Sequence, residues 1–570
     1  MSEKLISRHP SSNLSHVCGL QEEPLLELTI PQLLSKAQRE SEAKEALIFC
    51  EQGIRKSYKE FSDDVDSFAW GLYNLGLKKL DRVGVWSHNR YEWIIVQFAT
   101  ARLGIILVNI NPAYGIYELE YALNKVECSA LIMSSGFKSS DYVDDILKIS
   151  PELVHQEKYK LSLAKLPHLK QIIIMDDNIH TGMISFEEVL NVSPNIGKLD
   201  EITNTLWPTD PINIQFTSGT TGRPKGATLT HKNIVNNAFF VMEAMNFTST
   251  DRLCVPVPFY HCFGMVMGTL GCVSKNAVMV IPGQGFDALK TLKAIAEEKC
   301  TGVYGVATMF NSELELSNFS SFDLSSLRTG IMAGGPCPIE LMRKVQSKMN
   351  MTEITIAYGM TETSPVSFQS NVSDPLEKRV TSVGRVHPHV EVKIVDQLGN
   401  IVPVGDQGEL CTRGYSVMMG YWNDEDRTKE TIDDDGWLRT GDLANMDSNG
   451  YVNVTGRLKD MIVRGGENIY PREIEEFMYS HPSISHVQVF GVPDKVLGEA
   501  VCAWIILRDG KFVSEKEIIN FCKRKLAYFK IPKYINFVQE VPMTITGKPQ
   551  KFLMREIMIN KLNLVEQATA

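Results

Sequence analysis

The feature that most constrains the fold is a strand–helix–strand pattern that recurs along the chain. A short apolar strand at 83–86 precedes a helix that begins at Tyr91, and a second apolar strand follows from Ile105. The order recurs from Leu253, where LCVPV is followed by a Gly- and Met-rich helix and the strand AVMVI, and again from Leu327. Parallel strands joined by crossover helices have this order, so the sequence predicts an α/β fold with helix-covered, mostly parallel sheets.

The chain also divides into a large and a small part. At 570 residues it is longer than one hydrophobic core usually supports. Short strands and turns replace the first pattern at about 380–458, including a hairpin signal, DSNGY, at 447–451. A compact mixture of helices and strands follows from Lys459. We therefore predict a large N-terminal domain, residues 1–458, whose last part is a β-rich subdomain, and a small α+β C-terminal domain, residues 459–570.

Composition excludes several classes of function. A net charge of -10 argues against a nucleic-acid partner, which would require a basic surface. The 11 cysteines are odd in number and never spaced as CxxC, so they indicate neither a disulfide framework nor a zinc site. The most apolar stretch, 93–110, is interrupted by Gln97, Arg102 and Gly104, which predicts a helix and a buried strand rather than a transmembrane segment.

The segment TSGTTGRPKG, at 217–226, has the composition of a phosphate-binding loop. It combines three glycines, four hydroxyl side chains and two cations directly after the apolar run INIQF. Glycines let the backbone approach an anion, the hydroxyls donate hydrogen bonds, and Arg223 and Lys225 offset negative charge. The loop is not the GxxxxGK[ST] motif, because Gly226 follows Lys225. The alternative is an ordinary Gly- and Ser-rich surface loop.

Further motifs follow this loop in a fixed order. They are PFYHCFG from Pro258, AGGP from Ala333, YGMTET from Tyr358, GWLRTGD from Gly436, GRLKDMIVRGGENIYPREIE from Gly456, and TGK ending at Lys548. Together they resemble the motifs of the adenylate-forming superfamily, which includes acyl-CoA synthetases, luciferases and peptide-synthetase adenylation domains. The resemblance covers roughly 28–564, and it is strongest to the branch of medium-chain acyl-CoA ligases.

The resemblance implies a nucleotide site. It assigns ATP to Thr217, Ser218, Gly219, Thr220, Thr221, Gly222, Lys225, Gly334, Gly335, Pro336, Ala357, Tyr358, Gly359, Asp442, Arg457 and Lys548. Tyr358 would stack on adenine opposite the AGGP turn. Asp442 would accept hydrogen bonds from the ribose hydroxyls, and Arg457 would reach the same sugar. A tyrosine at the end of a strand is more often core, and an aspartate after glycine often serves a turn.

The resemblance also assigns the catalytic residues Lys548, Thr361, Glu362 and His261. Thr361 would contact the adenylate phosphate, and Glu362, with the Thr217 hydroxyl, would hold Mg²⁺, which in proteins binds one or two carboxylates together with substrate phosphates. Lys548 would bridge the carboxylate and the phosphate as negative charge develops. Outside its motif, an isolated glutamate or lysine is usually a solvated surface charge.

Two further groups of residues complete the expected site. The resemblance makes Lys459 a hinge about which the small domain moves, and it places Arg464, Gly465 and Gly466 along the CoA route. It also assigns the acyl pocket to Tyr260, His261, Met265, Val306, Met309 and Met360. This lining is apolar and contains no acidic partner for an ammonium group, so we expect an aliphatic acid rather than an amino acid.

The sequence thus predicts an ATP-dependent fatty acid–CoA ligase of the medium-chain class, with ATP, Mg²⁺ and coenzyme A. The alternatives are a fatty acyl-AMP ligase that loads a carrier protein and a non-catalytic adenylate-binding protein. No transit peptide is recognised at the N-terminus, which favours the cytoplasm of a bacterium over the mitochondrial matrix expected of a eukaryotic relative. A homodimer and peripheral membrane contact are left open.

Overall fold

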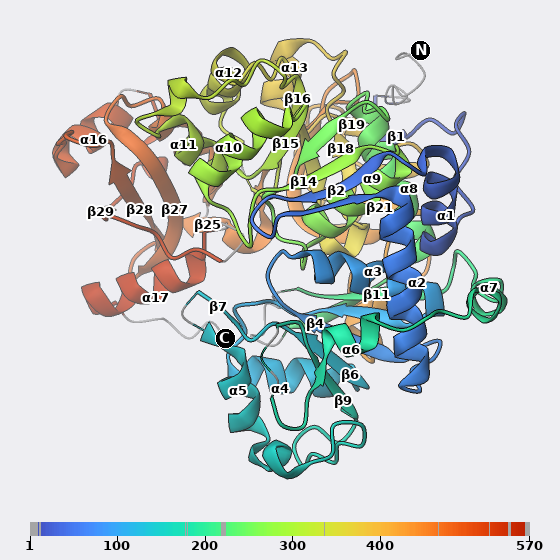
Figure 1. The fold of residues 1–570 in the computed structure, drawn as a ribbon. Helices are drawn as coiled ribbons and strands as arrows, with labels where there is room; N and C mark the ends of the chain where they lie inside the picture. Colours follow the sequence, from blue (N-terminus) through green and yellow to red (C-terminus); the bar gives the residue numbers. More distant parts are fainter. Residues whose placement is uncertain are drawn as a thin grey trace.

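The computed structural model describes residues 10, 13–138, 140–176, 178, 180–217, 224–335, 337–464, 467–523, 525–544 and 549–564. These residues form two large sheets, two five-stranded sheets and a two-stranded ribbon of β7 (Gly136–Phe137) and β8 (Ser140–Asp141). Figure 1 shows a large N-terminal domain and a small C-terminal one, drawn in orange and red. The predicted α/β fold class is therefore confirmed.

The first large sheet has eight strands. In spatial order they are β10 (Ile184–Ser185), β9 (Gln171–Ile174), β6 (Ala130–Met133), β4 (Arg82–Trp86), β5 (Ile106–Asn109), β11 (Pro211–Thr217), β12 (Lys225–Thr230) and β22 (Gly420–Tyr421). The strands from β10 to β11 are parallel, whereas β12 and β22 add antiparallel pairs at one edge. The phosphate-loop segment therefore connects the last parallel strand to an antiparallel one.

The second large sheet has nine strands. In spatial order they are β19 (Arg385–Val386), β18 (Val366–Gln369), β17 (Glu353–Gly359), β16 (Thr329–Met332), β15 (Gly302–Gly305), β13 (Arg252–Cys254), β14 (Val278–Ile281), β2 (Glu45–Phe49) and β3 (Ile54–Ser57). The strands from β17 to β2 are parallel, so the predicted parallel pairing is confirmed for the interior of this sheet.

Helices cover the sheets and pack between them. The main ones are α1 (Ile30–Ser41), α2 (Tyr58–Asn74), α3 (Tyr91–Leu103), α4 (Ile116–Lys125), α5 (Tyr142–Ile149), α6 (Phe186–Leu190), α7 (Ile196–Thr203), α8 (His231–Ala244), α10 (Ala288–Glu298), α11 (Ala307–Leu314), α12 (Ile339–Lys348), α13 (Leu376–Thr381) and α14 (Glu425–Thr431). Every residue of α3 except Glu92 is buried, which explains its continuous apolar sequence. In the described part of the chain, no helix has the length and apolar character needed to cross a bilayer.

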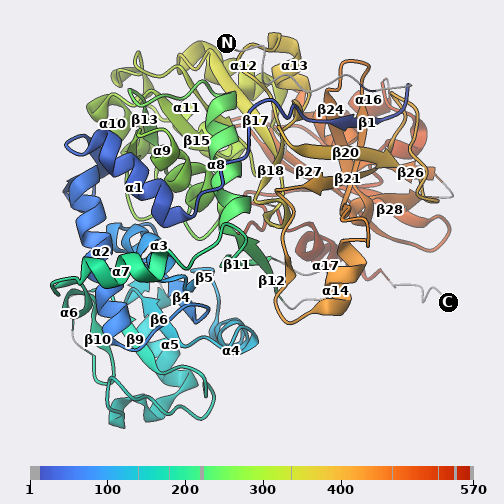
Figure 2. The same ribbon diagram turned by 90° about the vertical axis from the view of Figure 1, so that its right-hand side faces the viewer.

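The third sheet is entirely antiparallel and has five strands. In order these are β1 (His16–Cys18), β20 (Val390–Val395), β21 (Gly408–Gly414), β23 (Leu438–Met446) and β24 (Val452–Arg457). The predicted hairpin joins β23 to β24, with the Asp447 amide donating to the Tyr451 carbonyl at 2.9 Å. The pairing of β1 with β20, seen in Figure 2, was not predicted, because three residues are too few for an alternation pattern.

The fourth sheet belongs to the C-terminal domain. It contains β26 (Glu467–Ile469), β25 (Ile462–Arg464), β28 (Gly498–Leu507), β27 (Ile484–Asp494) and β29 (Tyr534–Phe537), and α15 (Pro471–Tyr479), α16 (Glu515–Lys523) and α17 (Lys551–Leu562) complete the domain. The 3₁₀ turn η6 (Leu458–Asp460) connects β24 to β25. Arg472 of α15 donates to the Val454 carbonyl of β24 at 2.5 Å, which joins the two domains beside this turn.

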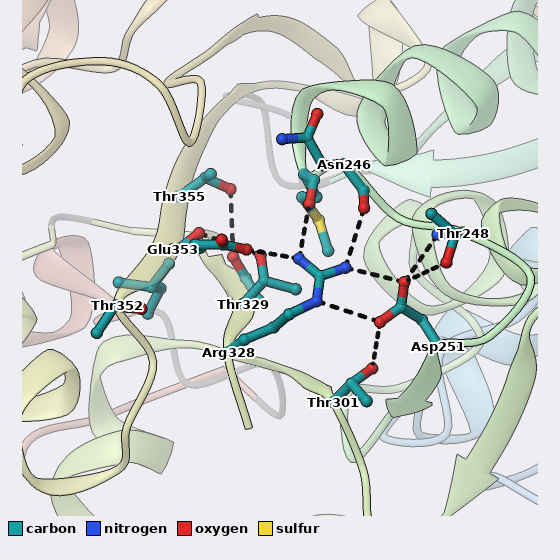
Figure 3. Close-up of polar contacts among 12 residues, drawn as sticks. Asn246, Thr248, Asp251, Thr301, Arg328, Thr329, Thr352, Glu353 and Thr355 are labelled. Atoms are coloured by element: carbon teal, nitrogen blue, oxygen red, sulfur yellow. Dashed lines mark hydrogen bonds and ion pairs between the residues drawn. The ribbon is translucent and has the colours of Figure 1, made fainter. Parts of the chain in front are cut away.

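An ion-pair network anchors one end of the nine-stranded sheet (Figure 3). Arg328, which precedes β16, donates to Asp251 Oδ2 at 2.8 Å, to Glu353 Oε2 at 2.5 Å and to the Asn246 carbonyl at 2.9 Å. Asp251 is only 4% exposed; burial opposes its ionisation, but hydrogen bonds from Arg328 and Thr301 keep its pKa below the usual value. The network therefore joins the starts of β13, β16 and β17.

Substitution of Arg328 by alanine is expected to lower the free energy of unfolding by about 3 kcal/mol, because it leaves the buried Asp251 carboxylate without its cation. Guanidinium denaturation followed by tryptophan fluorescence measures the change. Arg343→Ala is the control, since its partners Glu340 and Glu377 are 72% and 70% exposed, and it should change stability by less than about 0.5 kcal/mol. Equal effects of the two substitutions would contradict the anchoring role.

A buried acid in α11 is expected to make stability depend on pH. Glu313 is 1% exposed, its Oε2 has no hydrogen-bond partner among the described residues, and burial raises its pKa from 4.5 to about 8. The folded chain therefore keeps a proton that the unfolded chain releases. Between pH 4.5 and 8, stability should fall by up to about 1.4 kcal/mol per pH unit, and Glu313→Gln should remove this slope. Unfolding midpoints of both proteins from pH 5 to 8 test it; parallel profiles would count against it.

Candidate active site

Two strands of the eight-stranded sheet flank the predicted phosphate loop in the sequence. Thr217 ends β11 and Lys225 begins β12, and the two residues are paired across the antiparallel ladder. The predicted ligands Ser218, Gly219, Thr220, Thr221 and Gly222 follow Thr217 in the sequence and lie outside the described residues.

Glu362 lies where the two large sheets meet. It belongs to the 3₁₀ turn η5 (Thr361–Thr363), which follows β17 directly. A Cβ atom at Gly359 would lie 1.7 Å from the Pro365 carbonyl oxygen, so the close approach that forms this turn requires glycine. Glu362 is 6% exposed. The predicted residues Thr361 and Glu362 are therefore held at the junction by the backbone.

Both hydrogen bonds that described residues donate to the Glu362 carboxylate reach the same oxygen. Glu362 Oε1 accepts hydrogen bonds from the Tyr421 hydroxyl at 2.9 Å and from Thr217 Oγ1 at 3.4 Å. No described residue donates to its Oε2. Burial, and next the charge of Glu362, raise the pKa of Tyr421, so its hydroxyl stays a donor. Tyr421 was not predicted; a tyrosine in a two-residue edge strand carries no pattern that marks it.

A second polar chain connects the nine-stranded sheet to the third sheet. The Tyr358 hydroxyl donates to Asp442 Oδ2 at 2.6 Å, and Arg457 Nε lies 2.9 Å from Asp442 Oδ1. Asp442 is 5% exposed. Burial and then the Asp442 charge raise the pKa of Tyr358 well above its usual value. The structure thus brings together the three residues predicted for adenine and ribose, and one of them, Tyr358, precedes Glu362 by four residues in the sequence.

The other predicted wall of the adenine site follows β16. Gly334 has φ +84°, a left-handed conformation that favours glycine, and the Cys337 thiol lies 3.5 Å from the Gly335 carbonyl. Ala357, next to Tyr358 in β17, is 8% exposed. Pro336 lies outside the described residues. Both described glycines therefore lie in a tight turn at the end of a strand next to β17.

Several predicted acyl-pocket residues share one hydrophobic core. Met265, Val306 and Met309 are all buried in it. Tyr260 is 7% exposed, and its ring centroid lies 4.9 Å from that of His261. Met360 and His261 are partly exposed. The structure thus places three of the six residues predicted for the acyl pocket in one buried apolar cluster.

Two amide side chains that were not predicted contact Met265, one of the residues predicted for the acyl pocket. The Met265 sulfur accepts a hydrogen bond from Asn109 Nδ2 at 3.4 Å and a longer one from Gln215 Nε2 at 3.8 Å. Met265 belongs to a π-helix, η3 (Phe263–Leu270), followed by α9 (Gly271–Ser274), where an ordinary helix was expected. Its carbonyl also accepts from Gln97 Nε2 at 3.4 Å. These side-chain bonds support the wider turn, and π-helical turns occur frequently at functional sites.

The C-terminal domain holds the remaining predicted residues. Arg464 ends β25 and donates through Nη1 to the Phe529 carbonyl at 2.5 Å, and Lys459 is exposed in η6. Gly465, Gly466 and Lys548 lie outside the described residues. The structure therefore places one end of the predicted CoA loop but not its glycines or the lysine.

The donor set fits Mg²⁺ better than a transition metal. Among the described residues, no three His, Cys, Asp or Glu side chains cluster as metal ligands. One carboxylate oxygen, Glu362 Oε2, and the Thr217 hydroxyl are hard donors, which suit a cation that takes its other ligands from phosphates and water. Glu362 and Thr217 would hold this cation, which neutralises the charge of the polyphosphate.

The fold, with its large N-terminal and small C-terminal domain, is that of an adenylate-forming enzyme. The chain matches the family model of the AMP-binding enzyme over residues 34–422 and that of the AMP-binding enzyme C-terminal domain over residues 473–548. The chain belongs to the AMP-binding enzyme family, the adenylate-forming superfamily inferred from its motifs.

Curated relatives cover nearly the whole chain. The chain is 45% identical to the mitochondrial medium-chain acyl-CoA ligase ACSF2 of Danio rerio, over 97% of this chain and 92% of that protein. It is 47% identical to the putative acyl-CoA synthetase YngI of Bacillus subtilis, over 95% and 99%. The crystal structure of the anthranilate CoA ligase AuaEII with anthranoyl-AMP matches with a TM-score of 0.83 and 26% identity, over 95% and 99%. The predicted branch of the superfamily is confirmed.

Proposed function

We propose that this protein is an ATP-dependent acyl-CoA ligase for medium-chain fatty acids. The observation that carries the proposal is the junction at Glu362, where the phosphate-loop strands, the YGMTET turn and the RTGD strand bring their predicted ATP ligands together. Two relatives, from a fish and a bacterium, bear the names of an acyl-CoA ligase and a putative acyl-CoA synthetase.

In the first half-reaction, the fatty acid carboxylate attacks the α-phosphorus of ATP, and pyrophosphate leaves. The phosphate loop and Lys225 hold the triphosphate, while Asp442 and Arg457 orient the ribose. Mg²⁺, when bound at Glu362, screens the charge of the phosphates. Lys548 stabilises the charge that develops on the transferred phosphoryl group and the attacking carboxylate. The product, acyl-AMP, keeps one carboxylate oxygen between carbon and phosphorus.

In the second half-reaction, the CoA thiol loses its proton and the sulfur attacks the acyl carbonyl, so that AMP leaves. The small domain turns about Lys459, which withdraws Lys548 and brings the loop of Arg464, Gly465 and Gly466 to the site. The exposed η6 turn and the few contacts beside it, such as the one between Arg472 and Val454, support a hinge at this boundary. The domain limits 1–458 and 459–570 are part of this proposal.

The acid is proposed to be aliphatic and of medium length. Met265, Val306 and Met309 form an apolar lining without a charged side chain. The amides of Asn109 and Gln215 lie behind Met265 and are occupied by the Met265 sulfur, the Tyr260 carbonyl and the Cys262 thiol. The cytoplasmic location and the homodimer remain predictions.

A substrate panel from acetate to palmitate, with ATP, Mg²⁺ and CoA, tests the proposal. We expect acyl-CoA, AMP and pyrophosphate in equal amounts, with the highest kcat/KM near octanoate. Acyl-AMP that accumulates whether or not CoA is present would favour the fatty acyl-AMP ligase instead. The absence of any acid-dependent pyrophosphate exchange would favour a non-catalytic adenylate-binding protein.

A further inference from the structure

Tyr421 lies between the two elements that are proposed to bind the polyphosphate and the cation. Its strand, β22, pairs with β12, so that Tyr421 faces Ala227 in the ladder. The flanking backbone makes the same connection. The Trp422 amide donates to the Gly226 carbonyl at 2.8 Å, and the Met418 amide donates to the Glu362 carbonyl at 2.9 Å. The segment 418–422 thus connects β12, the strand that follows the predicted phosphate loop, to the η5 turn.

The two parts of the Tyr421 side chain contact opposite charges. The hydroxyl donates to Glu362 Oε1 at 2.9 Å. The ring centroid lies 4.7 Å from the Lys225 ammonium, a cation–π distance. Tyr421 is 7% exposed, so both contacts are largely shielded from water. One side chain therefore contacts both a carboxylate and an ammonium that are predicted to bind the cation and the phosphates.

Two other buried tyrosines in this chain make a different kind of contact, whereas Tyr451, like Tyr421, donates to a carboxylate, Asp374 Oδ1, at 2.7 Å. The Tyr58 hydroxyl donates to the Ala277 carbonyl at 2.8 Å, and the Tyr142 hydroxyl donates to the Pro112 carbonyl at 2.7 Å. Both satisfy neutral backbone groups. Tyr421 donates to a side-chain carboxylate in the candidate site, and a hydrogen bond to a charged acceptor is stronger than one to a neutral acceptor.

We propose that Tyr421 is a positioning residue, which orients Glu362 so that its Oε2 faces the divalent cation and holds Lys225 beside the same phosphates. The proposal rests on the proposed function, in which Glu362 holds Mg²⁺. A partner that orients a metal ligand typically changes metal affinity by roughly 10- to 100-fold when it is removed. Loss of the hydroxyl should therefore affect the cation, and loss of the ring should in addition affect ATP.

Tyr421→Phe separates the two contacts, because it removes the hydroxyl and keeps the ring. We expect the Mg²⁺ concentration for half-maximal ATP–pyrophosphate exchange to rise about 10-fold, with the rate at saturating Mg²⁺ within about threefold of the unmodified protein. Binding of Mn²⁺ to the protein with a non-hydrolysable ATP analogue, measured by electron paramagnetic resonance, should weaken by the same factor. Tyr421→Leu should raise the KM for ATP as well.

Tyr58→Phe is the matched control, since it removes a buried tyrosine hydroxyl of α2 that, among the described residues, bonds only to backbone carbonyls. It should leave the Mg²⁺ requirement and Mn²⁺ binding unchanged. Octanoyl-CoA formation from supplied octanoyl-AMP should be unchanged in Tyr421→Phe. The proposal is overturned if Tyr421→Phe lowers exchange equally at every Mg²⁺ concentration, or leaves Mn²⁺ binding unchanged. Failure of the proposed function would instead appear as absent exchange in the unmodified protein.

Discussion

Replacement of Lys548 by alanine is expected to lower the rate of acyl-AMP formation by about 100-fold or more, while the conversion of supplied octanoyl-AMP and CoA to octanoyl-CoA persists. The reason is that negative charge develops on the phosphoryl group only in the first half-reaction. A neutral methyl group cannot stabilise it. ATP–pyrophosphate exchange measures the first step, and thioester formation from octanoyl-AMP measures the second.

The control for Lys548→Ala is Lys516→Ala, which removes an exposed lysine from α16 of the same domain. Neither half-reaction should change in this variant. If Lys548→Ala slowed both half-reactions equally, Lys548 would not distinguish the two steps, and the proposed exchange of Lys548 for the CoA loop would be wrong.

Replacement of Gly466 by leucine is expected to have the opposite pattern. A leucine side chain at this position would fill the route along which the resemblance places pantetheine. Thioester formation should fall by about 100-fold, because the thiol no longer reaches the carbonyl in a reactive geometry. Pyrophosphate exchange should stay within about threefold of the unmodified protein, because the first half-reaction does not use this loop.

Gly197→Leu serves as the control for this change. Gly197 is exposed in α7, and the nearest atom to an added Cβ lies 3.7 Å away, so leucine is accommodated there. CoA turnover that is unchanged in Gly466→Leu would refute the assigned route. Loss of exchange and thioester formation together would point to a disturbed domain rather than to a blocked route.

The interior of the fold could be predicted from the sequence because its signals are local. The strand at Arg82–Trp86 and the helix at Tyr91–Leu103 follow from apolar runs of the appropriate length. Ser514 and Glu517 form the expected capping box, with the Ser514 amide donating to Glu517 at 2.8 Å. The addition of β1 to the third sheet depends on pairs such as Val17 with Val392, 375 residues apart in sequence, and no local pattern contains that information.

The site residues that lie in sequence motifs could be predicted. Tyr358, Asp442 and Arg457 lie in different motifs, and the structure joins them through hydrogen bonds and an ion pair. Tyr421 and Asn109 could not be found in this way. Their roles depend on which side chain each one contacts in an element distant in sequence, and an amide at the end of the strand Ile106–Asn109 gives no sign of its neighbour.

Transfer of oxygen from the acid to AMP tests the central claim, the acyl-adenylate route, most directly. The protein is incubated with octanoate labelled with ¹⁸O in both carboxylate oxygens, ATP, Mg²⁺ and CoA, and the products are analysed by mass spectrometry. The account predicts one ¹⁸O atom in AMP and none in pyrophosphate, because the C–O bond to the adenylate breaks when sulfur attacks. Label in inorganic phosphate together with ADP, or none in AMP, would contradict it.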